Sequence, residues 1–139
     1  MLEVQLEDML TDAETKQLYA GLLASDPAPR RYQTLTLSLR APDRRLDGAL
    51  LAATAWNWLS IDVLWIEPSL RGRGFGRSIV LEAERIARQR GCTHARLDTF
   101  DFQARSFYER FGYSVYAQLE GFPAGHTQFH LTKSLAPAS

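Results

Sequence analysis

A glycine- and arginine-rich segment directly after an apolar run constrains this chain most. Residues 63–66 are Val-Leu-Trp-Ile, which is typical of a buried strand, and Pro68 ends the run because proline cannot donate to a strand ladder. Glycine then occupies every second position of residues 72–76, and helical periodicity begins at Ile79. A strand, a tight turn and a helix start leave unpaired main-chain N–H groups and a positive helix dipole at the turn. The segment therefore predicts an anion-binding loop, and a diphosphate suits it best.

Two well-known phosphate motifs do not match this loop. The Walker A pattern needs a lysine after its last glycine, but Arg77 follows Gly76. The dinucleotide-binding pattern Gly-x-Gly-x-x-Gly needs a third glycine at position 77, which is again Arg77. What remains is Arg71-x-x-Gly74-x-Gly76 directly after a strand, with full charges on Arg71, Arg73 and Arg77.

A second pattern lies further along the chain. Residues 103–113 contain Ala104-x-x-x-Tyr108-Glu109-Arg110-x-Gly112-Tyr113. The two patterns together, at this separation, resemble the GNAT family of N-acetyltransferases over about residues 60–119. The resemblance implies acetyl-CoA as cosubstrate and a pair of parallel strands that splay apart to hold it.

The periodicity of the chain predicts an α/β fold of one domain. Alternation or apolar runs favour strands near residues 2–6, 33–40, 49–56, 58–66, 94–100, 113–119 and 126–135, and helices are expected over 12–25, 78–90 and 103–111. The strand, helix, strand order over residues 60–100 requires a parallel pair, so the sheet is mixed and mostly antiparallel. The resemblance places helices on both faces. We expect the domain to span residues 1–135 and residues 136–139 to be a frayed tail.

Three local details accompany this prediction. Thr11 and Glu14 form a capping box for the first helix, and Asp47-Gly48 is expected to interrupt the chain as a turn. In the helix over 78–90, Glu84 belongs to the polar face, and the opposite face carries an apolar stripe of Ile79, Val80, Ala83, Ile86 and Ala87.

Composition limits the possible partners. Sixteen basic and sixteen acidic residues balance, so no global field attracts nucleic acid or an anionic membrane. Cys92 is the only cysteine, and His94, His126 and His130 lack metal-ligand spacing, so neither a disulfide framework nor a metal site is expected. The acidic N-terminus and the absence of a long apolar run predict a cytoplasmic protein.

The resemblance also assigns site residues. Main-chain groups of Leu64, Trp65 and Ile66 would pair with the pantetheine arm of acetyl-CoA, and the loop would hold the pyrophosphate through Arg71, Gly72, Arg73, Gly74, Phe75, Gly76 and Arg77. Tyr108 matches the tyrosine that protonates the departing CoA thiolate; a tyrosine packed in the core is the alternative. Many family members carry Asn where this chain has Asp101, and a carboxylate cannot donate the bonds of an amide. Gln103 is expected to supply a cofactor contact instead.

A neutral amine must attack the thioester, so a base has to take a proton from the acceptor. Asp62 is the first candidate, because two-residue alternation places it on the strand face of Leu64 and Ile66. Glu67 and Glu120 are further candidates for the base, and Asp62 could instead be an ion-pair or structural carboxylate. The predicted function is transfer of acetyl from acetyl-CoA to a primary amine of a small molecule or a protein. A non-catalytic acyl-CoA sensor of the same fold is the main alternative, and a homodimer is a further hypothesis.

Overall fold

The computed structural model describes residues 1–135 of the 139-residue chain. Its contacts divide the chain into two compact units, Met1–Arg30 and the part that begins at Arg31. The predicted frayed tail at 136–139 lies outside the described residues.

The first unit contains one helix, α1 (Asp12–Leu23). The predicted capping box is confirmed: the Glu14 main-chain N–H donates to Thr11 Oγ1 at 3.1 Å, and the Thr11 N–H donates to Glu14 Oε1 at 2.9 Å. The predicted strand over residues 2–6 is wrong, because these residues have no regular structure. Alternation identifies the two faces of a strand, but a strand forms only where a neighbour pairs with its N–H and C=O groups, and no described residue does so here.

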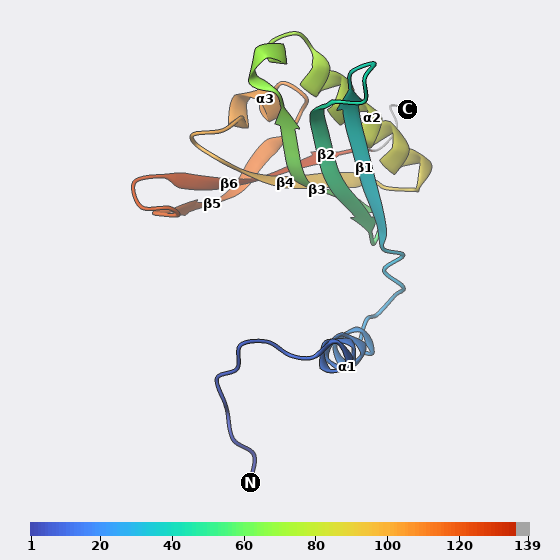
Figure 1. The fold of residues 1–139 in the computed structure, drawn as a ribbon, viewed down its shortest axis with the longest axis vertical. Helices are drawn as coiled ribbons and strands as arrows, with labels where there is room; N and C mark the ends of the chain where they lie inside the picture. Colours follow the sequence, from blue (N-terminus) through green and yellow to red (C-terminus); the bar gives the residue numbers. More distant parts are fainter. Residues whose placement is uncertain (136–139) are drawn as a thin grey trace. The chain divides into compact units, whose positions relative to one another are not determined.

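The second unit is built on one six-stranded sheet with the order β1-β2-β3-β4-β6-β5 (Figure 1). Only β3 and β4 are parallel, which confirms the mixed α/β fold predicted from the sequence. The strands are β1 (Gln33–Arg40), β2 (Leu46–Ala55), β3 (Trp58–Ile66), β4 (His94–Phe100), β5 (Ser114–Glu120) and β6 (Thr127–Ser134). The helical elements of this unit are η1 (Pro68–Leu70), α2 (Phe75–Gln89) and α3 (Arg105–Glu109).

The core lies between α2 and the sheet. The predicted apolar stripe of α2 is buried, including Val80, Ala83 and Ala87, and it packs against β1, β2 and β3 (Figure 1). Leu50 and Leu59 are fully buried beneath it. Because α1 belongs to the first unit, helical cover of the second sheet face stays a prediction.

Glu84 of α2 is not on the polar face as predicted, because its side chain is fully buried. Lys133 Nζ on β6 lies 2.8 Å from Glu84 Oε1, and the Tyr113 hydroxyl donates to Glu84 Oε2 at 2.8 Å. These partners are distant in sequence, so helical periodicity could not reveal them. The carboxylate is buried because it is paired.

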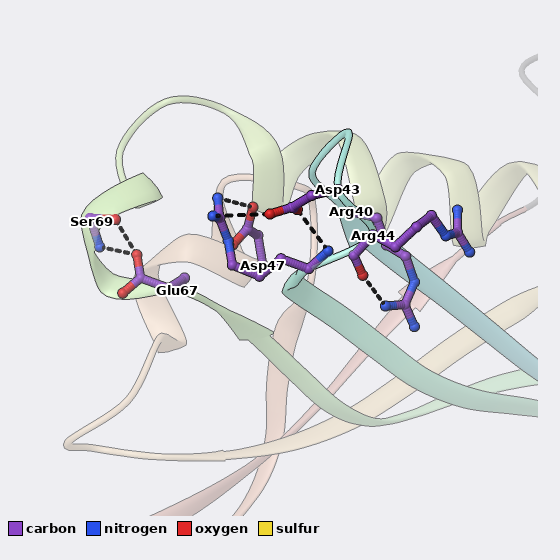
Figure 2. A network of polar contacts seen from close by, with 7 residues as sticks. Arg40, Asp43, Arg44, Asp47, Glu67 and Ser69 are labelled. Atoms are coloured by element: carbon purple, nitrogen blue, oxygen red, sulfur yellow. Dashed lines mark hydrogen bonds and ion pairs between the residues drawn. The ribbon is translucent and has the colours of Figure 1, made fainter.

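The predicted break at Asp47-Gly48 is also wrong, since both residues lie inside β2. The Asp47 carboxylate accepts hydrogen bonds from Arg45 Nε at 2.9 Å and Nη2 at 3.3 Å, within a polar network at this end of the sheet (Figure 2). A Cβ at Gly48 would come within 2.9 Å of the Trp65 carbonyl oxygen. The glycine therefore serves a close approach of two strands, and the chain turns between β1 and β2 before Asp47, where the Arg44 N–H donates to the Ala41 carbonyl at 2.9 Å.

Candidate active site

A cleft opens where the two parallel strands separate. β3 pairs with β4 only from Trp58–His94 to Ile61–Leu97. Beyond that point β3 stays on β2 and β4 stays on β6. The strands therefore diverge toward their carboxyl ends, as expected for the splayed pair, and a cleft of about 840 Å³ lies between them and the helices that follow.

Asp62 is the first residue of β3 beyond this pairing, and it forms a β-bulge. Val63 pairs with Leu51 of β2 and Ile61 pairs with the next residue, so Asp62 has no partner on β2. The bulge shifts the alternation, and Asp62 is exposed whereas Ile66 is buried. The expectation that these two residues share a face does not hold for that reason. Asp62 nevertheless lines the cleft, and its carboxylate makes no hydrogen bond or ion pair with another described residue.

The predicted anion loop runs from the end of β3 to the start of α2. Glu67 caps η1, accepting from the Ser69 N–H at 2.8 Å and from the Ser69 hydroxyl (Figure 2). Arg71 Nε donates to the Ile66 carbonyl at 2.9 Å, which ties the loop to β3. Gly74, with φ of 87°, is the N-cap of α2. A side chain would be strained in that left-handed conformation.

The N-terminus of α2 lies at the cleft. A Cβ on Gly76 would sit 3.3 Å from Phe107 Cζ, so this glycine lets α2 approach α3 closely. The first-turn N–H groups of a helix have no intrahelical acceptor and favour an anion. Arg71 and Arg77 add two charges to the cleft lining. Among the predicted cofactor-binding residues Arg73 alone does not line the cleft, whereas the others do: Leu64, Trp65, Ile66, Arg71, Gly72, Gly74, Phe75, Gly76, Arg77 and Gln103.

Tyr108 of α3 lines the cleft from the core side. Its side chain is 7% exposed and packs edge-on against Phe107 and Tyr113. Its hydroxyl makes no hydrogen bond with a described residue, yet no fully buried side-chain oxygen or nitrogen of the described part lacks a partner. The hydroxyl is therefore reachable from the cleft. Burial raises the pKa of Tyr108 to about 12, so at neutral pH the phenol is a proton donor.

Comparison with known proteins matches this geometry to one family. A model of the acetyltransferase (GNAT) family matches residues 9–113. The chain belongs to this family. A blasticidin-S acetyltransferase from Streptomyces morookaense is 40% identical over 91 residues, which are 65% of this chain and 67% of that protein. An acetyltransferase from Agrobacterium fabrum is 32% identical over 99 residues, 71% of this chain and 72% of the other.

A solved structure gives the same answer. The crystal structure of an acetyltransferase from Bacillus cereus superposes with a TM-score of 0.82 at 27% identity, covering 94% of this chain and 97% of the other. This GNAT protein is thus an acyl-CoA-dependent N-acetyltransferase.

Two residues at the end of β4 in this GNAT chain have structural partners. Gln103 Oε1 accepts from the Phe100 N–H at 3.1 Å and from the Thr99 hydroxyl at 3.3 Å, which holds the turn into α3. Its amide nitrogen makes no hydrogen bond to a described residue. The Asp101 carboxylate accepts from the Thr127 N–H at 3.0 Å and lies 2.9 Å from His126 Nδ1. Asp101 therefore anchors the start of β6 and does not line the cleft.

Asp98 lines the cleft from β4, although it is not among the site residues predicted from the sequence. Leu97 and Thr99 are buried on either side of it, so a strict alternation placed it on the other sheet face. The alternation around Asp98 can be seen in the sequence, but it does not show that Asp98 lines a cleft. That conclusion requires the separation of β3 and β4 directly after Leu97.

Three further observations concern the function classes considered above. In residues 1–135, no group of three or more His, Cys, Asp or Glu side chains is arranged to hold a metal ion. None of the described helices combines the length and apolar character that crossing a membrane requires. Cys92 is buried, and burial raises the pKa of its thiol, which disfavours the nucleophilic thiolate.

The raised pKa of Tyr108 predicts a measurable titration. An ordinary tyrosine is half ionised near pH 10, whereas Tyr108 should remain a phenol there because burial disfavours the phenolate. The phenolate absorbance of the native protein and of Tyr108→Phe should thus be equal at pH 10 and diverge only as the pH approaches 12. Divergence already at pH 10 would show that the hydroxyl is fully hydrated.

Proposed function

We propose that this enzyme transfers the acetyl group of acetyl-CoA directly to a primary amine, with Tyr108 as the general acid. The observation that supports it is the Tyr108 hydroxyl, which is accessible from the cleft and has no partner in the described chain. The loop over residues 71–77 holds the pyrophosphate through Arg71, Arg77 and the main-chain N–H groups of the α2 N-terminus. Arg73 contributes charge at the rim.

The β3 segment Leu64–Ile66 holds the pantetheine arm. β2 occupies one edge of this segment, and β4 leaves the other edge unpaired, so main-chain groups are available to the arm. A main-chain N–H of the segment also stabilises the oxyanion that forms on the thioester carbonyl. Gln103 contributes its free amide nitrogen from the opposite wall.

The acetyl transfer needs no covalent enzyme intermediate. The amine nitrogen attacks the thioester carbonyl carbon, the carbon–sulfur bond breaks, and the thiolate takes the proton of the Tyr108 hydroxyl. The nitrogen loses a proton to solvent as the amide forms, and the Tyr108 phenolate regains one from solvent. A thiol has a pKa of about 8.5 and an alkylammonium about 10.4. At neutral pH the departing thiolate must therefore gain a proton, and the acceptor ammonium must lose one before it can attack. Asp62 takes the proton that the ammonium loses, since its carboxylate lines the cleft without a protein partner.

The acceptor is a small organic amine rather than a protein amino group. The 40% identical relative is named for blasticidin S, which makes this compound the first to test. Exposed aromatic side chains next to the cleft suit an organic molecule: Phe102 lines the cleft and stacks on Phe100 at 5.1 Å. Aromatic faces also favour cationic groups.

Thiol release from acetyl-CoA tests the proposal. Purified enzyme is supplied with blasticidin S, polyamines, aminoglycosides, amino acids and lysine peptides, and free CoA is measured with and without each amine. Amine-dependent release supports the proposal and identifies the acceptor. Binding of acetyl-CoA without release for any amine would contradict it and favour the sensor alternative.

Arg77, which lines the cleft, and Arg73, which does not, should differ in their effect on acetyl-CoA binding. Arg77→Ala is expected to raise the KM for acetyl-CoA about tenfold, because it removes a charge-assisted contact inside the cleft. Arg73→Ala is the matched control and should raise it by less than about threefold, because Arg73 lies outside the lining and surface charges are screened. Equal effects would mean that the loop binds the pyrophosphate in another orientation.

A further inference from the structure

Asp98 and His130 form a hydrogen-bonded pair at the point where the sheet opens. They face each other across β4 and β6, and His130 Nδ1 lies 2.6 Å from Asp98 Oδ1. Asp98 is the first residue of β4 beyond its pairing with β3, just as Asp62 is the first beyond it on β3. Asp98 therefore lines the cleft where the two strands separate, and His130 lies beside it outside the cleft lining.

This pair lies on the sheet face opposite Tyr108. Leu97 and Thr99 belong to the buried side of β4, whereas Asp98 between them is exposed. His130 likewise alternates with buried Phe129 and Leu131. Tyr108 is part of the buried cluster that contains the α2 side chains. A thioester held at the opening is thus reached by the general acid from one face and by the Asp98 carboxylate from the other.

One oxygen of Asp98 is held and the other is available. Oδ1 has His130 at 2.6 Å and Arg96 Nη2 at 3.6 Å, while Arg96 Nη1 donates to the Ser60 hydroxyl at 3.4 Å. Oδ2 has no hydrogen-bond partner in the described chain. The carboxylate is 36% exposed, so a ligand can reach it. A carboxylate that is held in one orientation and has one unpaired oxygen can accept a charge-assisted hydrogen bond from a cationic N–H group.

We propose that Asp98 binds the ammonium group of the acceptor through Oδ2, and that His130 positions the carboxylate for this contact. The inference rests on the proposed function, because it needs an amine that attacks a thioester in this cleft. Acetyl-CoA occupies the side of the loop and of Tyr108, which leaves the opposite face to the acceptor. The ammonium bound to Asp98 then loses one proton to Asp62 and attacks as a neutral amine.

The first test removes the negative charge of the Asp98 side chain and keeps its shape. With the amine that gives the fastest wild-type release as probe, Asp98→Asn should raise the KM for the amine at least tenfold and leave the KM for acetyl-CoA within twofold. A structural defect would raise both constants or lower the melting temperature. Unchanged amine KM would overturn the inference.

The second test asks whether His130 acts through its hydrogen bond to Asp98 or only through the volume of its side chain. His130→Leu removes the N–H that holds Asp98 Oδ1 and should raise the amine KM about fivefold. His130→Asn supplies an amide N–H in place of Nδ1–H and should restore it to within twofold of the wild type. Equal effects of the two substitutions would show that no hydrogen bond to Asp98 is needed.

The chain offers a matched control in its other aspartate–histidine pair, Asp101 and His126, which lies outside the cleft lining. His126→Leu should leave the amine KM within twofold, and a rise equal to that of His130→Leu would contradict a specific role for Asp98.

The proposed function and the role of Asp98 can fail separately. If no amine releases thiol with the wild type, the proposed function fails and the inference with it. If the wild type turns over and Asp98→Asn keeps its amine KM, the inference alone fails.

Discussion

Tyr108→Phe is expected to lower kcat by about a hundredfold to a thousandfold while the affinity for acetyl-CoA stays within about twofold. General acid catalysis contributes a factor of this size, and the substitution removes only the hydroxyl from a ring that remains packed. The hydroxyl has no protein partner, so its loss leaves no orphaned group. Steady-state kinetics with free-thiol detection gives kcat, and isothermal titration gives the affinity.

Tyr113→Phe is the matched control for this prediction. Tyr113 is also a buried tyrosine, but its hydroxyl donates to Glu84 and does not line the cleft. It should lower stability and keep kcat within about threefold at a temperature where the variant is folded. A wild-type kcat for Tyr108→Phe would refute the general-acid role and leave Tyr108 as a packing residue.

Lys133→Met is expected to cost about 3 kcal/mol of stability, because it leaves the Glu84 carboxylate buried without its closest cation. The Glu84 side chain is 1% exposed and the Lys133 side chain 17%. Arg88 Nη2 lies 3.9 Å from the same oxygen, too far for a strong hydrogen bond. For a domain of this size the melting temperature should fall by about 10 °C. Urea unfolding followed by circular dichroism measures the loss directly.

Two control variants test whether the unpaired Glu84 charge causes the loss of stability. Arg85→Met breaks the exposed Glu82–Arg85 pair on the same helix and should leave the melting temperature nearly unchanged. Replacing the network together, with Glu84→Met, Lys133→Met and Tyr113→Phe, should recover most of the stability, because no buried charge or hydroxyl then lacks a partner. A triple variant as unstable as Lys133→Met would mean that packing volume, not charge, is responsible.

The sequence predicted correctly those features whose structure depends on residues close together in the chain. The stripe of Val80, Ala83 and Ala87 follows the helical period, and the capping box of Thr11 and Glu14 spans three residues. Both are short-range features whose energy comes from neighbours along the chain. The strand, loop and helix order around Arg71 and Gly74 is of the same kind, so this order of elements could be predicted before the fold was known.

Predictions failed where a distant partner decides the outcome. Leu2, Val4 and Leu6 alternate like a strand, but no described strand pairs with them. Asp47 and Gly48 lie in β2 because Gly48 pairs with Leu39 of β1 and Ile66 of β3, and Glu84 is buried because Lys133 and Tyr113 reach it. No pattern of neighbouring residues encodes such a pairing.

The sequence by itself determined the family, the mixed α/β fold and the order of strand, glycine-rich loop and helix, because each depends on residue types at short, regular spacing. Only the tertiary structure decided where the sheet opens and which carboxylates meet there. Asp62 and Asp98 are 36 residues apart, and they come to the same place because β3 and β4 stop pairing directly before them. The register between two strands depends on the packing of the whole sheet, so the acceptor side of the cleft appears only after the chain has folded.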